Sequence, residues 1–129
     1  VYKFKGVDKT TLCTDAMRGA GMPDGESILG SLTNGQKVII EDGVAKLPDR
    51  SAFAGSVATA DRLVRTMINI AGIPLIDAIR MITLTPARIL HVDSQKGSLE
   101  EGKDADIVIF DNQINVTTTI SKGHVIYNQ

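Results

Sequence analysis

Apolar residues recur at helical spacing between residues 59 and 90. We expect a first helix that begins after Thr59, which can cap it, and ends at Gly72. A second helix is expected from Pro74, and a short third helix from Thr85, its N-cap, to Leu90. The apolar face of the first helix comprises Leu63, Val64, Met67, Ile68 and Ala71, and that of the second comprises Leu75, Ala78, Ile79 and Ile82.

Patterns typical of strands occur on both sides of these helices. Before them, Asn34–Gly35 and Asp42–Gly43 separate three short apolar runs, which predicts a β-meander with a two-residue turn at each pair. After them, the apolar run Ala105–Phe110 and an alternating run over 114–120 predict two strands, and Lys122–Gly123 predicts a turn into a last strand. Because so few strands do not close a core, we expect this carboxyl-terminal sheet to pack on other structure.

Asp15 is the main candidate for chemistry. The run Thr10–Thr14 is short and rich in Thr and Leu, which predicts a buried strand directly before Asp15, and a glycine-rich loop at 19–25 follows. Barrel enzymes place catalytic groups at the carboxyl ends of strands, so Asp15 is a candidate general acid and base. A lone Asp after a strand is also typical of a cap that accepts backbone N–H bonds, and on spacing alone both interpretations stay open.

Other polar or small residues give weaker signals. The loop 53–56 is built from small residues after Phe53, and it either presents backbone N–H groups to a ligand or simply connects to the next helix. His91 and His124 lack the spacing of a metal site, and helix-end packing and strand-edge hydrogen bonding are expected instead. Cys13 is expected to be a buried structural thiol.

Composition excludes several classes of function. Lys plus Arg number 14 and Asp plus Glu 15 among 129 residues. The composition therefore predicts no basic face, which argues against nucleic acid as the main partner. Aromatic residues make up 4% and Trp is absent, which argues against a platform for stacked bases. A single cysteine forms no internal disulfide and fits a reducing compartment. No apolar run reaches the length of about 18 residues that a membrane helix needs, so we expect no membrane span.

Four stretches of the chain resemble known families. Residues 84–90 (LTPARIL) and 96–111 (KGSLEEGKDADIVIFD) resemble the carboxyl-terminal signature of the amidohydrolase superfamily. Residues 14–25 (TDAMRGAGMPDG), together with Phe53–Ser56 (FAGS), are similar to the narrower family of N-acetylglucosamine-6-phosphate deacetylases. The matching stretches follow the order and spacing of that family over nearly the whole chain.

The resemblance implies an α/β fold that combines part of a (β/α)₈ barrel with a flanking β-sandwich. Residues 1–92 would hold the last barrel strand carrying Asp15, a β-meander insertion and the final helices of the barrel. Residues 93–129 would supply strands of the sandwich. The chain begins without an initiator Met or a helix cap, and family members are much longer, so we expect it to be the carboxyl-terminal segment of a longer enzyme.

The resemblance also implies a reaction, the metal-dependent hydrolysis of the acetamide of N-acetylglucosamine 6-phosphate to glucosamine 6-phosphate and acetate. Asp15 would transfer the proton, and would also contact a second metal in binuclear members, while Phe53, Ala54 and Gly55 would lie against the sugar. The divalent metal, zinc or iron, would take most of its ligands from residues upstream of this chain, so we expect the isolated segment to be inactive. A cytoplasmic homodimer of the complete enzyme is expected.

Two other interpretations remain. The first is another amidohydrolase of the same superfamily that acts on a cyclic amide or imide. The loop that follows Asp15 argues against it, because that loop matches the deacetylases specifically. A β-rich, non-catalytic assembly module would leave Asp15 with a structural role.

Overall fold

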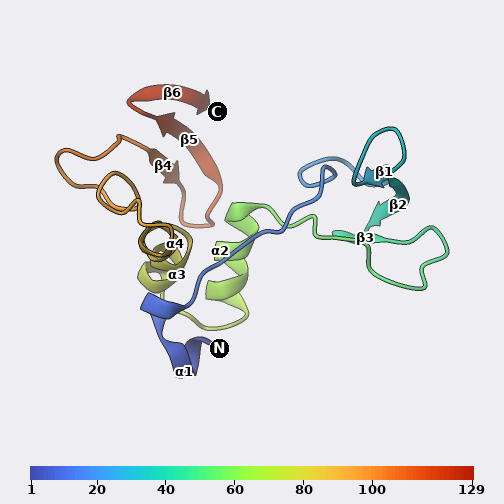
Figure 1. The fold of residues 1–129 in the computed structure, drawn as a ribbon, viewed down its shortest axis with the longest axis horizontal. Coiled ribbons are helices and arrows are strands. Elements are labelled where there is room, and N and C mark those ends of the chain that lie inside the picture. The colour runs from blue at the N-terminus through green and yellow to red at the C-terminus, as the bar shows by residue number, and fades with distance from the viewer. The chain divides into compact units, whose positions relative to one another are not determined.

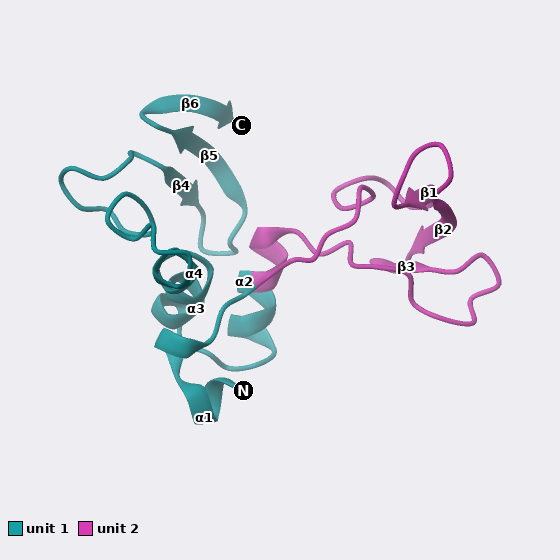
Figure 2. Ribbon diagram, in the orientation of Figure 1, with its two compact units in different colours: residues 1–12, 64–129 teal, residues 13–63 magenta.

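The computed structural model describes residues 1–129, and the chain separates into two compact units. One unit consists of residues 13–63, and the other consists of residues 1–12 together with 64–129 (Figure 2). No helix is long and apolar enough to cross a membrane.

The unit formed by residues 13–63 contains the predicted β-meander (Figure 1). Strands β1 (Gly25–Leu29), β2 (Gln36–Glu41) and β3 (Val44–Lys46) pair antiparallel in the order β1-β2-β3. Asp42 and Gly43 form the turn between β2 and β3, both with positive φ, as predicted. Alternation along β2 buries one face of the sheet. The core of this unit comprises Met17, Val38, Ile40, Ala45, Ala54 and Val57.

The connection between β1 and β2 differs from the prediction of a two-residue turn at Asn34–Gly35. The last pair of the ladder is Leu29 with Gln36, so residues 30–35 all belong to the connection. Neither Asn34 nor Gly35 has positive φ, which a two-residue hairpin turn of this type needs. Instead, the Gly35 N–H donates to the Ser31 carbonyl oxygen at 2.7 Å, and a Cβ at Gly35 would collide with backbone oxygens. Gly35 is therefore required for close backbone approach.

The predicted strand at Thr10–Thr14 does not form in the structure. The Leu12 N–H donates to the Met81 carbonyl oxygen at 2.9 Å, but no ladder runs along the segment. Cys13 is exposed rather than buried, so the prediction of a buried thiol is wrong. Because a strand needs a paired neighbour, Thr and Leu content alone was not sufficient to make one here.

Short helices and their connections form the core of the other unit. Helix α1 (Tyr2–Lys5) and the 3₁₀ helix η1 (Val7–Lys9) precede α2 (Ala60–Asn69), α3 (Leu75–Ile82) and α4 (Leu84–Ile89) along the chain. The helices predicted after Thr59 and Pro74 are confirmed, with Pro74 at the N-cap position of α3 and Gly72 at positive φ after α2. The core comprises Val64, Ile73, Ala78, Met81 and Ile114.

Thr85 was predicted as the N-cap of the last helix, and this prediction is wrong. Helix α4 begins at Leu84, with Thr83 at the N-cap position. Thr85 lies inside the first turn and is only 1% exposed. Its hydroxyl donates to the Val7 carbonyl oxygen at 2.9 Å, so it serves a contact between α4 and η1 rather than the end of its own helix.

The carboxyl-terminal strands form a separate antiparallel sheet in the order β4-β5-β6, as predicted. They are β4 (Ile107–Phe110), β5 (Val116–Ser121) and β6 (His124–Asn128), with Lys122 and Gly123 at positive φ in the last turn. Lys96 donates to Asp104 and Asp106, and Asp106 accepts the Lys122 N–H at 2.8 Å, which ties the preceding loop to this turn. Several apolar side chains of the sheet stay exposed, including Val108, Ile109, Val125, Ile126 and Tyr127.

The Thr85–Val7 hydrogen bond gives a first testable prediction. Thr85→Val keeps the shape of the side chain but leaves the part-buried Val7 carbonyl without its donor, which costs roughly 0.5–1.5 kcal/mol, the net contribution of a typical hydrogen bond. We expect a lower urea midpoint when the helical circular dichroism signal is followed. Thr33→Val, which removes a hydroxyl from an exposed loop, is the control and should leave the midpoint nearly unchanged. Equal midpoints for the two variants would contradict the structural role of Thr85.

Candidate functional site

Asp15 lies on the surface of residues 13–63, directly before the Ala16 bridge. Its φ is 47°, in the left-handed region that Asp tolerates better than most residues. The side chain is exposed, and the residue after it, Ala16, forms a single parallel bridge with Ser56. Backbone geometry of this kind is enriched at functional sites, which agrees with the prediction of a functional role for Asp15.

The pairing of Ala16 with Ser56 brings two predicted site segments together. The Met17 N–H donates to the Ser56 carbonyl oxygen at 2.8 Å, which fixes the register of the two segments. Since the bridge is parallel, the residues that precede each partner, Asp15 and Gly55, lie on the same side of it. The structure therefore places Asp15 beside the end of the predicted substrate loop.

The loop residues Phe53, Ala54 and Gly55 differ in what they offer a ligand. Phe53 pairs with Lys46 in an antiparallel bridge, and its side chain is 78% exposed. Ala54 is buried in the core, and its N–H is taken by the Ala45 carbonyl oxygen at 2.8 Å. Gly55 is exposed at φ 91°. The aromatic ring of Phe53 and the backbone of Gly55 are therefore accessible, whereas the Ala54 amide is not.

An open depression adjoins this loop and is lined by Lys46, Arg50, Ser51, Ala52 and Phe53. Asp15 is not among its lining residues. Glu41 accepts hydrogen bonds from Arg50 Nε at 2.9 Å and Nη2 at 3.1 Å, and from Lys46 Nζ at 3.2 Å. The two cations are thus already neutralised by carboxylates, and the depression is not a free anion site.

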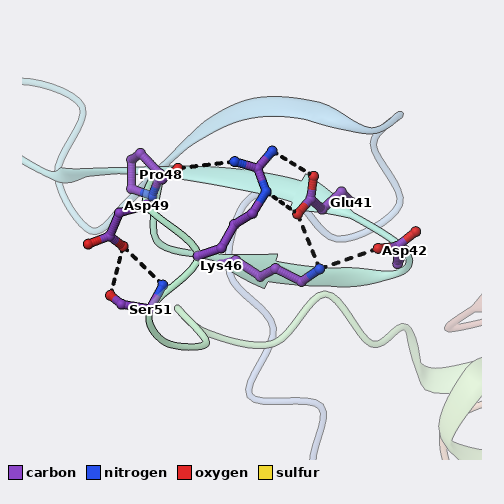
Figure 3. Close-up of polar contacts among 7 residues, drawn as sticks. Glu41, Asp42, Lys46, Pro48, Asp49 and Ser51 are labelled. Carbon is purple, nitrogen blue, oxygen red and sulfur yellow. Dashed lines mark hydrogen bonds and ion pairs between the residues drawn. The ribbon is translucent and has the colours of Figure 1, made fainter.

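Figure 3 shows how carboxylates hold the turn before Phe53. Lys46 lies between Glu41 and Asp42, and Asp49 accepts both the N–H and the hydroxyl of Ser51, at 3.1 and 2.7 Å. The hydrogen bonds from Arg50 and then Lys46 lower the pKa of Glu41, and those from the Ser51 hydroxyl and N–H lower the pKa of Asp49. These contacts order the segment that leads into the candidate loop.

The chain alone does not form a metal centre. No three side chains among His, Cys, Asp and Glu lie close enough together to hold an ion. His91 is exposed at φ 57° just after α4, and His124 is exposed at the start of β6. Residues 1–129 therefore do not by themselves fit the divalent metal that the resemblance implies.

Four residues near the site, Met17, Glu41, Lys46 and Arg50, were missed by sequence reasoning. Met17 belongs to no apolar stripe, yet it is buried against the candidate loop. Glu41 and Lys46 flank the predicted Asp42–Gly43 turn, and a diagonal pair of opposite charges across a hairpin is a signal that the sequence does contain. Arg50 also donates to Glu41, but this contact depends on the path of the turn that follows β3, and no local sequence pattern predicts it.

Comparison with known proteins identifies the family. The profile of the amidohydrolase family matches residues 7–126, and the chain belongs to this family. Its members have a TIM-barrel fold, and this chain is a small α/β piece with two three-stranded sheets.

Individual relatives point in a narrower direction. The N-acetylglucosamine-6-phosphate deacetylase of Lysinibacillus sphaericus is 40% identical over 124 residues, which cover 96% of this chain and 30% of that protein. The putative N-acetylgalactosamine-6-phosphate deacetylase of Escherichia coli K12 is 39% identical over 118 residues, 92% of this chain and 68% of that protein. The chain thus spans about 30% of the length of the first of these relatives.

A solved structure agrees with these relatives. The crystal structure of the N-acetylglucosamine-6-phosphate deacetylase from Pasteurella multocida superposes with a TM-score of 0.87 at 31% identity. The superposition covers 98% of this chain and 32% of that one. The fold of this chain is therefore similar to that of the corresponding part of a deacetylase.

The Glu41 contacts give a testable pH dependence. The folded pKa of Glu41 is lowered, so its contribution to stability is complete above the unfolded pKa of about 4.3 and is lost as pH falls through the lower folded value. We expect protection of the Ala54 amide against hydrogen exchange to decrease over that range in the native chain. In Glu41→Gln, the Ala54 amide should be less protected at neutral pH than in the native chain. Its protection should also lack the decrease that protonation of Glu41 causes in the native chain.

Glu26→Gln is the matched control, because Glu26 is exposed on β1 of the same sheet. Its protection should follow that of the native chain at every pH. The same pH dependence in the native chain and in Glu41→Gln would show that Glu41 does not hold the loop.

Proposed function

We propose that this chain is the carboxyl-terminal part of an N-acetylglucosamine-6-phosphate deacetylase, which hydrolyses the acetamide to glucosamine 6-phosphate and acetate. The observation that carries the proposal is the Ala16–Ser56 pairing, which sets Asp15 beside the Phe53–Gly55 loop. Relatives with this sequence pattern are named as deacetylases of amino-sugar phosphates, which supports the same substrate class here.

In this proposal Asp15 is the proton carrier. Its carboxylate accepts a proton from the attacking water as the new carbon–oxygen bond forms at the acetamide carbonyl. It then gives that proton to the nitrogen as the carbon–nitrogen bond breaks, so glucosamine 6-phosphate leaves as the amine and acetate is released. An exposed carboxylate next to a loop without bulky side chains at Ala54 and Gly55 suits transfer of the proton to and from a bound ligand.

The Phe53–Gly55 loop would hold the sugar. The exposed ring of Phe53 offers an apolar face for a pyranose ring, and Gly55 lets the ligand approach the backbone because it has no side chain. Ala54 would act through its small size and its place in the core, since its N–H is already bonded within the chain.

Several finer features also belong to the proposal. Proteins of this family are generally metal-dependent. A zinc or iron ion would need most of its ligands from outside residues 1–129, with Asp15 as a ligand in a binuclear site. The resemblance further supports residues 1–92 as barrel, residues 93–129 as sandwich strands, a homodimer of the complete enzyme and a cytoplasmic location. The exposed apolar residues of the β4–β6 sheet are compatible with strands that pack in a sandwich.

A substitution at Asp15 tests the proposal. Residues 1–129 replace the matching segment of the L. sphaericus deacetylase, and this protein, named the chimera below, is assayed for acetate release from N-acetylglucosamine 6-phosphate. Asp15→Asn keeps the size of the side chain but removes the proton acceptor, so kcat is expected to fall by roughly 10²–10⁴-fold with folding intact. Asp24→Asn, in the same exposed loop region, is the control and should retain the native rate.

The outcome also separates the alternative functions. An unchanged rate in Asp15→Asn would leave only a structural role for Asp15. Preference of the native chimera for a cyclic amide or imide over the amino-sugar phosphate would support a different amidohydrolase. The 129-residue chain alone is expected to release no acetate, and turnover by it would show that the metal ligands are not needed from elsewhere.

A further inference from the structure

Met17 connects the two segments that form the candidate site. Its backbone N–H donates to the Ser56 carbonyl oxygen at 2.8 Å, two residues after Asp15 and one residue after Gly55. Its side chain is only 9% exposed, whereas the other methionine of residues 13–63, Met22, is 63% exposed. Met17 therefore contacts the loop through both its backbone and its side chain.

The side chain of Met17 fills the space between two glycine backbones. At Gly55, an added Cβ would lie 3.3 Å from Met17 Cγ and 3.5 Å from Met17 Cβ. At Gly19, the N–H donates to Met17 Sδ at 3.0 Å, and an added Cβ would lie 2.9 Å from the same sulfur. Met17 thus packs between the glycine-rich segment after Asp15 and the candidate substrate loop, and Ile40 beside Gly19 and Leu29 beside Gly55 are the other side chains that limit their approach.

We propose that Met17 is a positioning residue that holds Asp15 at the correct distance from the sugar bound on the Phe53–Gly55 loop. This inference rests on the proposed function. Met17 itself faces the core and acts through its neighbours. A smaller side chain would let the Gly19 turn and the Gly55 backbone shift, and a displacement of about 1 Å at a reacting group can cost as much as 10²-fold in rate.

Steady-state kinetics of the chimera test this role. Met17→Ala is expected to lower kcat by about tenfold or more while KM changes by less than about threefold, because the sugar still contacts Phe53 and Gly55. Met17→Leu keeps nearly the same volume and should restore kcat to within about threefold of the native value. Met22→Ala is the matched control and should leave both constants unchanged. Rates are expressed per folded molecule, with the folded fraction taken from thermal unfolding.

The outcomes decide between positioning and simple core packing. A lower melting temperature for Met17→Ala with an unchanged kcat per folded molecule would show that Met17 only fills the core and would overturn the inference. Should Met17→Ala fail to fold, Met17→Val takes its place, since it stays apolar but is too short to reach the Gly19 N–H. A tenfold loss of kcat in that variant supports the role, and a native kcat overturns it.

Asp15→Asn in the same assay separates this inference from the proposed function. An inactive Asp15→Asn with a fully active Met17→Ala contradicts the inference alone. An Asp15→Asn variant with the native rate contradicts the proposed function and the role of Met17 with it.

Discussion

The backbone pairing between Ala16 and Ser56 is the constraint on which the candidate site depends. The residues it joins are far apart in the sequence, and the Met17 N–H to Ser56 carbonyl bond reinforces their register. Without this pairing, Asp15 would belong to an isolated surface turn and Phe53–Gly55 to a connector before α2. The parallel direction of the bridge places Asp15 and Gly55 on the same side of it.

The β-meander holds the Phe53–Gly55 loop through its other neighbour, strand β3. The loop extends the sheet beyond β3, since Phe53 pairs with Lys46, and the Ala54 N–H bonds to the Ala45 carbonyl oxygen. Charged groups at the surface then order the turn before the loop, with Glu41 accepting hydrogen bonds from both Lys46 and Arg50. Exposed ion pairs contribute little to stability individually, so their importance here lies in the conformation that they select.

In the unit of residues 1–12 and 64–129, sequence-distant segments are also joined by a few polar contacts over an apolar core. Thr85 donates to the Val7 carbonyl oxygen, and Asp8 accepts from Arg80 and Arg88 at 2.6 and 3.4 Å, so η1 is held against α3 and α4. The carboxyl-terminal sheet is ordered by local hairpin turns and by Lys96 between Asp104 and Asp106. The exposed apolar side chains of its strands are typical of a sheet that packs against further structure.

Local features were predictable from the sequence because their causes are local. Apolar periodicity placed α2 and α3, the Asp42–Gly43 and Lys122–Gly123 pairs placed two turns at positive φ, and sequence motifs indicated the family. The strand at Thr10–Thr14, the turn at Asn34–Gly35, the cap at Thr85 and the burial of Cys13 were predicted wrongly. The strand, the cap and the thiol depend on which distant segment supplies a hydrogen-bond partner or a covering surface. The turn depends on the bond from the Gly35 N–H to the Ser31 carbonyl oxygen within the connection itself. Tertiary structure alone decided that Met17 packs against Gly55 and that Asp15 lies beside the loop, because residues 15–17 and 53–56 are far apart in the sequence and no local pattern predicts their pairing.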